Sequence, residues 1–293
     1  MAKSYRQLCP AKVNLYLKVL HRRADGYHDL VTVMQMVSLA DELTVTPEGA
    51  DLRFSCDQPD LPQGRENLVC RAALGFQEET GVKVAAHLSL HKRIPTAAGL
   101  GGGSSDAAGA LKALNLLYGS PLDSSRLHAL AARLGADVPF FLGQGPAVAT
   151  GIGTELSPVA LPSYHYLLLN PGVPLSTRWV YENLDLARLK EAPTPETWDP
   201  EHPERWVHND LSAVALKRLP ELAGWLTRLS EAGAVTQGIS GSGPTVFGLY
   251  STWEAAREGA RVLRRSFQGW LTVVQGLTGR ETDQTWEHRI WMI

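Results

Sequence analysis

The sequence predicts an α+β fold divided into two domains. Some segments alternate apolar and polar residues with a period of two, others repeat apolar residues at helical spacing, and the two kinds mix without strict βαβ alternation. The chain has 293 residues, against about 150 for a typical domain. We place the boundary in the Gly- and Pro-bearing stretch 151–162, which gives an N-terminal domain of residues 1–155 and a C-terminal domain of residues 156–293.

The composition is that of a globular protein with a sizeable core. Hydrophobic residues make up 44% and charged residues 20% of the chain, which excludes disorder, coiled coil and collagen. The 28 Lys and Arg residues nearly balance the 30 Asp and Glu residues, so the charge indicates no nucleic acid and no membrane as a partner. An anionic ligand must therefore be held by a local site.

Neither the cysteines nor the apolar segments indicate an extracellular or membrane protein. Cys9, Cys56 and Cys70 are odd in number and form no CxxC pair, so we expect no disulfide framework, no zinc site and a cytoplasmic location. No apolar run approaches the ~20 residues of a membrane span. Lys12 and Lys18 interrupt the first apolar stretch, so it is not a signal peptide.

Strands are predicted where apolar residues alternate or cluster between turn residues. The first two, 13–20 and 31–37, form a hairpin whose loop contains the turn dipeptide Asp25-Gly26. We expect an exposed loop at 190–207, where prolines lie among charges, and a second glycine-rich loop at 236–244. The remaining predicted strands are 43–45, 52–56, 82–90, 166–169, 245–250 and 270–277.

Helices are predicted from an apolar period of 3.6 residues and from their capping residues. The first begins at the N-cap Asn67 and ends at Gly81. Ser251 and Glu254 form a capping box for the last helix, which extends to about residue 267. The others are predicted at 107–118, 127–134, 210–219 and 220–231.

The most informative segment lies at 99–106, between a predicted strand and a predicted helix. Three consecutive glycines from Gly101 to Gly103 let the backbone approach a ligand closely, and the serines that follow can cap the helix. Unpaired backbone N–H groups at a helix N-terminus favour phosphate, so we interpret this segment as a phosphate-binding loop. The alternative is a flexible Gly/Ser linker, which the strong strand and helix patterns on both sides disfavour.

Two common phosphate-binding motifs are absent from the sequence. A P-loop requires a Gly-Lys dipeptide, which this chain lacks, and the Rossmann pattern counted from Gly99 has Ser104 where its third glycine belongs. The HRD and DFG signatures of protein kinases are missing as well. A different kind of phosphate site is therefore expected.

Five segments together resemble the motifs of a known family. They are Pro95-Thr96-Ala97-Ala98-Gly99-Leu100-Gly101-Gly102-Gly103-Ser104-Ser105, Pro10-Ala11-Lys12-Val13-Asn14, Ser240-Gly241-Ser242-Gly243-Pro244, Arg23-Ala24-Asp25-Gly26-Tyr27-His28 and Gly135-Ala136-Asp137-Val138-Pro139. The first segment resembles the ATP loop of the GHMP kinase superfamily, and the second and third resemble its first and third motifs. The last two resemble its members that act on a cytidine-diphosphate-linked methylerythritol. The resemblance covers roughly residues 5–280 and implies the two-domain GHMP kinase fold, with the active site in the cleft between the domains.

The resemblance implies that Lys12 and Asp137 are catalytic. Asp137 would accept the proton of the attacking hydroxyl, and Lys12 beside it would keep the carboxylate ionised. Each residue also has a simpler interpretation. Lys12 and Asn14 alternate with apolar residues as on a solvated strand face, and Asp137 precedes Pro139 as a helix N-cap does.

The resemblance also implies two sets of binding residues. In the substrate site, Tyr27 and Tyr181 would stack on the cytosine ring, His28 would make polar contacts to it, and Asn14 and Thr177 would help to hold the substrate. The ATP site would be formed by Asn67 and Val69 near adenine, by Lys92, and by the loop residues Pro95, Thr96, Ala97, Ala98, Gly99, Leu100, Gly101, Gly102, Gly103, Ser104 and Ser105.

The function that the resemblance implies is that of an ATP-dependent small-molecule kinase. It would phosphorylate the 2-hydroxyl of its cytidine-diphosphate-linked substrate, in the non-mevalonate route to isoprenoid precursors, with Mg²⁺ on the ATP phosphates. Whether Ser104, Ser105 or neither contacts the metal stays open. One alternative is another GHMP kinase, of homoserine or mevalonate type, which gives no reason for Gly26-Tyr27-His28. The other is a non-catalytic ATP- and sugar-sensing regulator, against which the pair of Lys12 and Asp137 argues.

Overall fold

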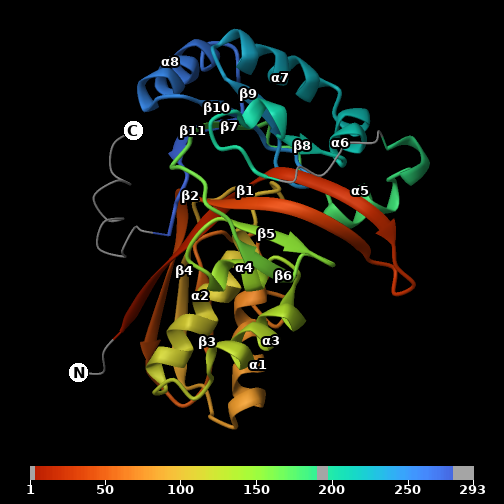
Figure 1. The fold of residues 1–293 in the computed structure, drawn as a ribbon. Helices are drawn as coiled ribbons and strands as arrows, with labels where there is room; N and C mark the ends of the chain where they lie inside the picture. Colours follow the sequence, from red (N-terminus) through yellow and green to blue (C-terminus); the bar gives the residue numbers. More distant parts are fainter. Residues whose placement is uncertain (1–3, 190–196, 280–293) are drawn as a thin grey trace. The chain divides into compact units, whose positions relative to one another are not determined.

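The structure is a computed structural model that describes residues 4–189 and 197–279 (Figure 1). The strands are β1 (Tyr5–Arg22), β2 (His28–Pro47), β3 (Arg53–Cys56), β4 (Ala86–His91), β5 (Ala147–Thr150), β6 (Glu155–Pro158), β7 (His165–Asn170), β8 (His208–Asn209), β9 (Thr236–Ile239), β10 (Val246–Tyr250) and β11 (Trp270–Gln275). The helices are α1 (Leu68–Thr80), α2 (Gly102–Leu117), α3 (Ser124–Leu134), α4 (Val138–Leu142), α5 (Thr177–Glu182), α6 (Ser212–Arg218), α7 (Glu221–Glu231) and α8 (Trp253–Leu263), with 3₁₀ turns η1 (Leu186–Arg188) and η2 (Pro203–Arg205).

The described residues form two sheets together with these helices, which confirms the predicted α+β class. One sheet has the strand order β3-β4-β2-β1-β8, and β5 pairs with both β2 and β6. The other sheet has the order β11-β7-β10-β9. Its strand pairs are all antiparallel, whereas β3 with β4 and β1 with β8 are parallel pairs.

The described residues group into two compact units whose segments alternate along the sequence. Unit 1 consists of residues 4–11, 39–94 and 101–143, and unit 2 of residues 12–38, 95–100, 144–189 and 197–279. Strands β1 and β2 contribute residues to both units. A domain boundary after residue 155 stays a prediction. The units do not follow it, because the stretch proposed for the boundary begins in the β5–β6 hairpin of unit 2.

Unit 1 contains helices α1 to α4, of which α2 begins within the predicted phosphate loop. Helix α1 contacts α2 and α3, and α4 contacts α2 and α3. The predicted ends of α1 are confirmed: the Asn67 side chain accepts the Val69 N–H at the N-cap, and Gly81 ends the helix in the left-handed conformation. Phe76 of α1 and Leu111 of α2 are fully buried in the core of this unit.

Unit 2 contains the second sheet, on one side of which α7 and α8 lie (Figure 1). The core that joins them includes Leu169 of β7, Val246 of β10, Leu229 of α7 and Leu263 of α8. Strand β8 pairs with β1 in the same unit, where Tyr16 lies opposite His208. This pairing was not predicted, because a strand of two residues has no visible periodicity.

Strands β1 and β2 are longer than predicted, and the separate strand predicted at 43–45 is the end of β2. Both strands have consecutive buried residues in their middle parts. A strand that is buried on both faces loses the alternation on which the prediction depends. The strand predicted at 82–90 begins only at Ala86, because the N–H groups of Val84 and Ala85 donate to the side chains of Gln77 and Tyr118 instead.

Three predicted loops and caps are wrong in detail. Residues 236–239 form β9, because they pair with β10, and only the residues after them form the glycine-rich loop. The N-cap of α8 is Thr252 rather than Ser251, and its hydroxyl accepts the Ala255 N–H at 3.1 Å. Part of the loop predicted at 190–207 lies outside the described residues. In the described part, Trp206 is buried and donates its indole N–H to the Asp199 carbonyl at 2.7 Å.

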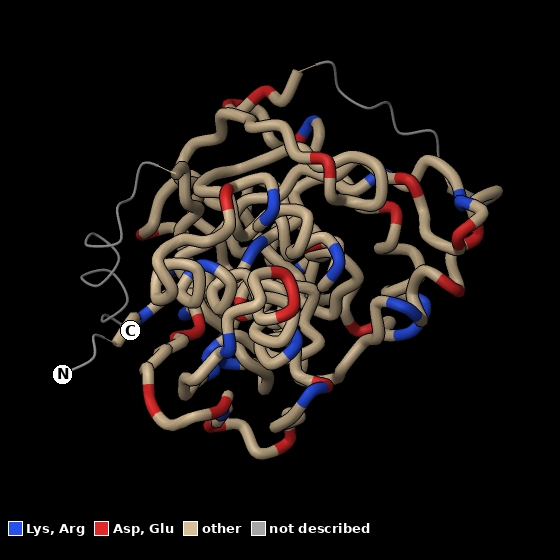
Figure 2. Tube along the Cα trace, turned by 90° about the horizontal axis from the view of Figure 1, so that it is seen from below, with Lys and Arg blue, Asp and Glu red and all other residues tan. Residues whose placement is uncertain are grey.

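The distribution of charge agrees with the composition. Basic and acidic residues are interspersed along the traced chain (Figure 2). Within residues 4–189 and 197–279, no helix combines the length and apolarity that a membrane span requires.

Candidate active site

The first motif places a lysine side chain inside unit 2. Lys12 lies in β1 and is only 3% exposed, so the interpretation as a solvated strand face is wrong. Its ammonium donates to Asn14 Oδ1 and, over 3.0 Å, to the Gly99 carbonyl. The Lys12 backbone N–H donates to the Leu100 carbonyl at 2.9 Å. A buried ammonium requires acceptors of this kind, because moving it from water into the protein interior without them costs roughly several kcal/mol.

A residue of the third motif, Ser240, donates a hydrogen bond to the same Gly99 carbonyl. Ser240 is fully buried, and its hydroxyl donates to the Gly99 carbonyl at 2.9 Å and accepts the Asn14 N–H at 3.2 Å. Gly241 has a φ of +55°, and a Cβ there would lie 3.0 Å from Asn14 Oδ1 and 3.2 Å from Lys12 Nζ. Gly99 has a φ of +77°, and its Cβ would lie 2.2 Å from the Ser240 carbonyl oxygen. Segments from three distant motifs therefore meet at one ammonium.

The glycine loop divides between the two units. Its first part, Pro95–Leu100, belongs to unit 2, where the Ala98 carbonyl accepts the Thr245 N–H at 3.3 Å. Its second part belongs to unit 1 and begins α2 at Gly102, five residues earlier than predicted. Gly101 is the N-cap, with a φ of +71° and no side chain to bond. The expectation that the serines cap this helix is therefore wrong.

The two serines lie in the first turn of α2 instead. Ser105 donates its backbone N–H to the Gly101 carbonyl, which closes the first helical turn. The N–H groups of Gly102, Gly103 and Ser104 precede that bond, so they have no acceptor within the helix. Such groups, at the positive end of the helix dipole, favour an anion. The Ser105 hydroxyl is buried without a hydrogen-bond partner.

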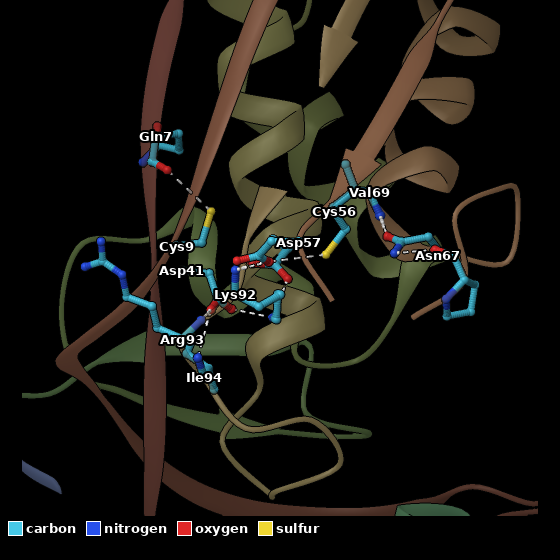
Figure 3. A network of polar contacts seen from close by, with 12 residues as sticks. Gln7, Cys9, Asp41, Cys56, Asp57, Asn67, Val69, Lys92, Arg93 and Ile94 are labelled. Carbon is cyan, nitrogen blue, oxygen red and sulfur yellow. Dashed lines mark hydrogen bonds and ion pairs between the residues drawn. The ribbon is translucent and has the colours of Figure 1, made fainter. Parts of the chain in front are cut away.

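A buried ion cluster lies beside the start of α2 (Figure 3). The Lys92 ammonium contacts Asp41 and, at 2.7 Å, Asp106, and all three side chains are nearly inaccessible to solvent. A Cβ added to Gly102 would lie 3.3 Å from Lys92 Nζ. Lys92 therefore lies close to Gly102 of the glycine loop, within unit 1. It also has two carboxyl partners, which the sequence did not indicate.

The two carboxyl groups of this cluster are not equivalent. Asp41 accepts two backbone N–H groups, of Arg93 at 2.5 Å and of Ile94 at 2.8 Å, in addition to the ammonium. Asp106 contacts Lys92 through one oxygen, and its Oδ1 has no hydrogen-bond partner. Burial raises the pKa of Asp106 to about 8, helped by the Asp41 charge and opposed by Lys92. Asp106 is therefore in its neutral form at neutral pH.

The residues predicted to lie near adenine have local partners. The Asn67 carbonyl oxygen accepts the Val69 N–H at 2.9 Å, and its amide donates to the Pro62 carbonyl at 3.0 Å. Figure 3 shows this cap apart from the ion cluster of Lys92. Val69 is almost fully buried. Capping and core packing explain Asn67 and Val69, and an adenine contact for either stays a prediction.

Asp137 occupies the N-cap position of α4 but does not cap it. Its φ and ψ of −81° and −13° are helical, and its side chain makes no capping hydrogen bond. By contrast, Asp123 before α3 accepts the Arg126 N–H at 2.9 Å, as a capping aspartate does. The simple interpretation of Asp137 as a cap is therefore wrong. Its catalytic role stays a prediction.

Of the residues predicted to bind the base, His28 and Tyr181 contact each other in unit 2. His28 stacks on Tyr181, with 5.2 Å between ring centroids and 26° between ring planes. Tyr27 is 60% exposed. Burial, with a smaller contribution from Arg22, lowers the pKa of His28, so its imidazole is neutral at neutral pH. A base sandwiched by Tyr27 and Tyr181 stays a prediction.

Thr177 lies against the third motif. It is the first residue of α5, and its hydroxyl is 2.8 Å from that of Ser242. Tyr181 follows on the same helix, four residues later. The predicted substrate residues Thr177 and Tyr181 thus share one short helix in the unit that holds Lys12.

Two polar residues of this site were missed by the sequence reasoning. The Thr32 hydroxyl accepts the Asn14 amide at 2.9 Å and donates to the Tyr16 carbonyl at 2.6 Å. Ser240 was noted as part of a motif but was not assigned to the site. The available signal for Thr32 was a hydroxyl residue in a mostly apolar predicted strand. This signal is ambiguous, because threonine is also favoured in strands.

Comparison with known proteins decides the family. The model of the GHMP kinase N-terminal domain matches residues 67–145, and that of the GHMP kinase C-terminal domain matches residues 200–269. A protein of Syntrophus aciditrophicus named 4-diphosphocytidyl-2-C-methyl-D-erythritol kinase is 45% identical over 260 residues, which cover 87% of this chain and 93% of that protein. The chain belongs to the 4-diphosphocytidyl-2-C-methyl-D-erythritol kinase family. It is therefore a small-molecule kinase.

Solved structures agree with this family. A crystal structure of 4-(cytidine 5′-diphospho)-2C-methyl-D-erythritol kinase is 40% identical, with a TM-score of 0.81 over 93% of this chain and 99% of that one. A homoserine kinase from Cytophaga hutchinsonii is 20% identical, with a TM-score of 0.72 over 95% of this chain and 96% of that one. The second likeness shows the shared fold alone. The resemblance inferred from the motifs is thus confirmed.

Proposed function

We propose that this protein transfers the γ-phosphoryl group of ATP to the 2-hydroxyl of 4-diphosphocytidyl-2-C-methyl-D-erythritol, in the non-mevalonate route to isoprenoid precursors. The products are ADP and the 2-phosphate. The family supports the choice of substrate. The observation that carries the proposal at atomic level is the buried Lys12 ammonium, which is bound by Asn14 and by the Gly99 carbonyl of the glycine loop.

Lys12 and Asp137 carry the chemistry in this proposal. The 2-hydroxyl oxygen attacks the γ-phosphorus, Asp137 accepts the hydroxyl proton, and the bond from that phosphorus to the ADP oxygen breaks. Lys12 stabilises the negative charge that develops on the attacking oxygen. The Asp137 side chain makes no capping hydrogen bond, so capping does not account for an aspartate at this position.

The start of α2 binds the phosphates of ATP in this proposal. Gly102, Gly103 and Ser104 offer backbone N–H groups without helical acceptors, and the helix dipole adds to their effect. A neutral Asp106 also favours this assignment, because its carboxyl group then adds no negative charge near the loop that would repel phosphate.

The first turn of α2 also fits a Mg²⁺ ion. The buried Ser105 Oγ is an oxygen without a hydrogen-bond partner, and oxygen is the ligand that Mg²⁺ prefers. Among the described residues, no three His, Cys, Asp or Glu side chains gather as a metal site of their own. This agrees with a metal held mainly by ATP, where it neutralises phosphate charge. Ser104→Ala and Ser105→Ala, each titrated with Mg²⁺, will identify which serine contributes.

An assay of ADP release tests the proposed function. The protein is supplied with ATP and, in separate reactions, with the cytidine-diphosphate-linked methylerythritol, homoserine or mevalonate. We expect ADP release only with the first acceptor. Release with homoserine or mevalonate alone would identify another GHMP kinase, and ATP binding without release in any reaction would favour the regulator.

A further inference from the structure

We propose that Thr32 is a positioning residue for phosphoryl transfer: its hydroxyl orients the Asn14 amide, and the amide in turn fixes the Lys12 ammonium. The inference rests on the proposed function of Lys12. It concerns residues of unit 2 only, and Thr32 belongs to none of the sequence motifs.

The first step concerns the single proton of the Thr32 hydroxyl. This proton is donated to the Tyr16 carbonyl, 2.6 Å away. The hydroxyl oxygen can therefore only accept from Asn14, whose amide nitrogen lies at 2.9 Å. The order of donors is fixed at this point, because a carbonyl oxygen cannot donate.

The second step concerns the two ends of the Asn14 side chain. Because its NH₂ group faces Thr32, its carbonyl oxygen faces the Lys12 ammonium and accepts from it. The opposite orientation would place the NH₂ group against the ammonium and the carbonyl against a hydroxyl with no proton left to give. Thr32 thereby determines which end of the amide Lys12 meets.

The third step concerns the other acceptor of Lys12. The Gly99 carbonyl also accepts the Ser240 hydroxyl, and that hydroxyl accepts the Asn14 backbone N–H. Lys12, Asn14, Ser240 and Gly99 thus close a ring of hydrogen bonds. Thr32 is attached to this ring from outside and fixes its direction.

Burial makes this orientation matter. Lys12, Asn14 and Thr32 are each 4% exposed or less, and Ser240 is fully buried. Bulk water cannot replace the Thr32 hydroxyl at this buried position. Without that hydroxyl, the Asn14 amide either lacks a hydrogen-bond acceptor or rotates away from its present orientation. A catalytic group that shifts by about 1 Å loses on the order of 10²-fold in rate. The effect of Thr32 should therefore be on turnover.

The Thr32 hydroxyl is not needed for the strand itself. Thr32 pairs through its backbone with Ala149 of β5, and its side chain has the shape of valine. Thr32→Val accordingly removes the hydroxyl while keeping volume and strand preference. Tyr166→Phe is a matched control, because the Tyr166 hydroxyl also makes a buried bond of 2.6 Å in the same unit, to Gln35, away from the ring.

Steady-state kinetics and thermal unfolding of these variants test the proposal. We expect Thr32→Val to lower kcat by about 10- to 100-fold, with KM for ATP unchanged, and Thr32→Ser to restore most of the loss. Tyr166→Phe should lower the unfolding temperature comparably and leave kcat unchanged. A wild-type kcat in Thr32→Val, or an equal loss in Tyr166→Phe, would overturn the proposal. Thr32→Ala takes the place of Thr32→Val if valine prevents folding.

A double-mutant cycle separates this proposal from the function on which it rests. If Thr32 acts through Asn14, Thr32→Val should cost nothing further in an Asn14→Leu background, whereas additive losses would contradict the relay. Lys12→Ala tests the proposed function itself. Full activity in Lys12→Ala would remove the catalytic role of Lys12. An inactive Lys12→Ala beside a fully active Thr32→Val would remove only the role of Thr32.

Discussion

Lys12 Nζ donates a hydrogen bond of 3.0 Å to the carbonyl oxygen of Gly99, a residue 87 positions away in the sequence. The same carbonyl accepts the hydroxyl of Ser240, another 141 positions along the chain. Three motifs that the sequence shows only as separate segments thus share one acceptor. The Lys12 ammonium is thus held by groups of the protein, as its proposed electrostatic role requires.

The role of Asp137 is tested by Asp137→Asn. We expect kcat to fall by about 10²- to 10⁴-fold, the usual contribution of a positioned general base, with KM for ATP unchanged. Asp123→Asn is the control, because Asp123 is a true N-cap and asparagine caps equally well. Steady-state kinetics on both variants decide the matter. Near-normal turnover in a folded Asp137→Asn would show that no proton passes to this carboxylate.

The glycine loop gives a prediction that distinguishes two neighbouring residues. A Cβ at Gly102 would lie 3.1 Å from Ile94 and 3.3 Å from Lys92 Nζ, whereas one at Gly103 would lie 3.6 Å from its nearest neighbour, Leu68. Gly102→Ala should therefore shift the start of α2 and weaken ATP binding about tenfold or more, while Gly103→Ala should pack without displacement. Nucleotide titration by calorimetry measures both. Equal affinities for Gly102→Ala and the wild type would return this segment to the linker interpretation.

Base recognition is tested with a uridine analogue of the substrate. Cytosine presents an amino donor and a ring acceptor that uracil inverts, and a buried polar site rejects such a mismatch by as much as ~10⁴- to 10⁵-fold. We expect the uridine analogue to be a very poor substrate. His28→Ala should reduce the ratio of kcat/KM for the cytidine substrate to kcat/KM for the uridine analogue. Tyr27→Ala should raise KM for the cytidine substrate by about five- to 100-fold, from the loss of one stacking contact. KM for ATP is the internal control, and equal turnover of the two analogues would end the cytidine assignment.

The neutral form of Asp106 predicts a pH dependence of stability. Because burial raises its pKa to about 8, the folded protein holds a proton that the unfolded chain releases near 3.8. The stability contributed by the neutral group is complete in acid and is lost as pH rises through 8. Asparagine cannot ionise, so Asp106→Asn should not lose stability in this way as the pH rises. Its unfolding temperature should exceed that of the wild type by more at pH 9 than at pH 5, and a difference independent of pH would place the charge on Asp106 after all.

Local signals in the sequence predicted much of the fold. The ends of α1 at Asn67 and Gly81 were predictable because caps depend on a few neighbouring residues. The interpretation of the glycine loop as a phosphate site rests on the general affinity of helix N-termini for anions and stays a prediction. Tertiary partners were not predictable. The N–H groups of Val84 and Ala85 donate to the side chains of Gln77 and Tyr118 rather than to a neighbouring strand. The sequence of residues 82–90 does not indicate these partners.

The same limit applies to the site. Lys12 and Asp137 were identified by resemblance, whereas their surroundings depend on which distant segments pack together. The expected contact of Lys92 with ATP stays a prediction. The structure adds that Lys92 lies between two carboxyl groups, of which Asp41 is 51 residues away. Thr32 belongs to none of the motifs seen in the sequence. Its importance is visible only once the direction of each hydrogen bond around Asn14 is known.

The fate of the γ-phosphoryl group tests the account most directly. The protein is incubated with ATP labelled in that group and with 4-diphosphocytidyl-2-C-methyl-D-erythritol, and the label is located in the product by NMR. The account predicts one ADP for each labelled product, with the phosphate on the 2-hydroxyl and no labelled product from Lys12→Ala. ADP release without transfer of the label, or a label on any other hydroxyl, would contradict it.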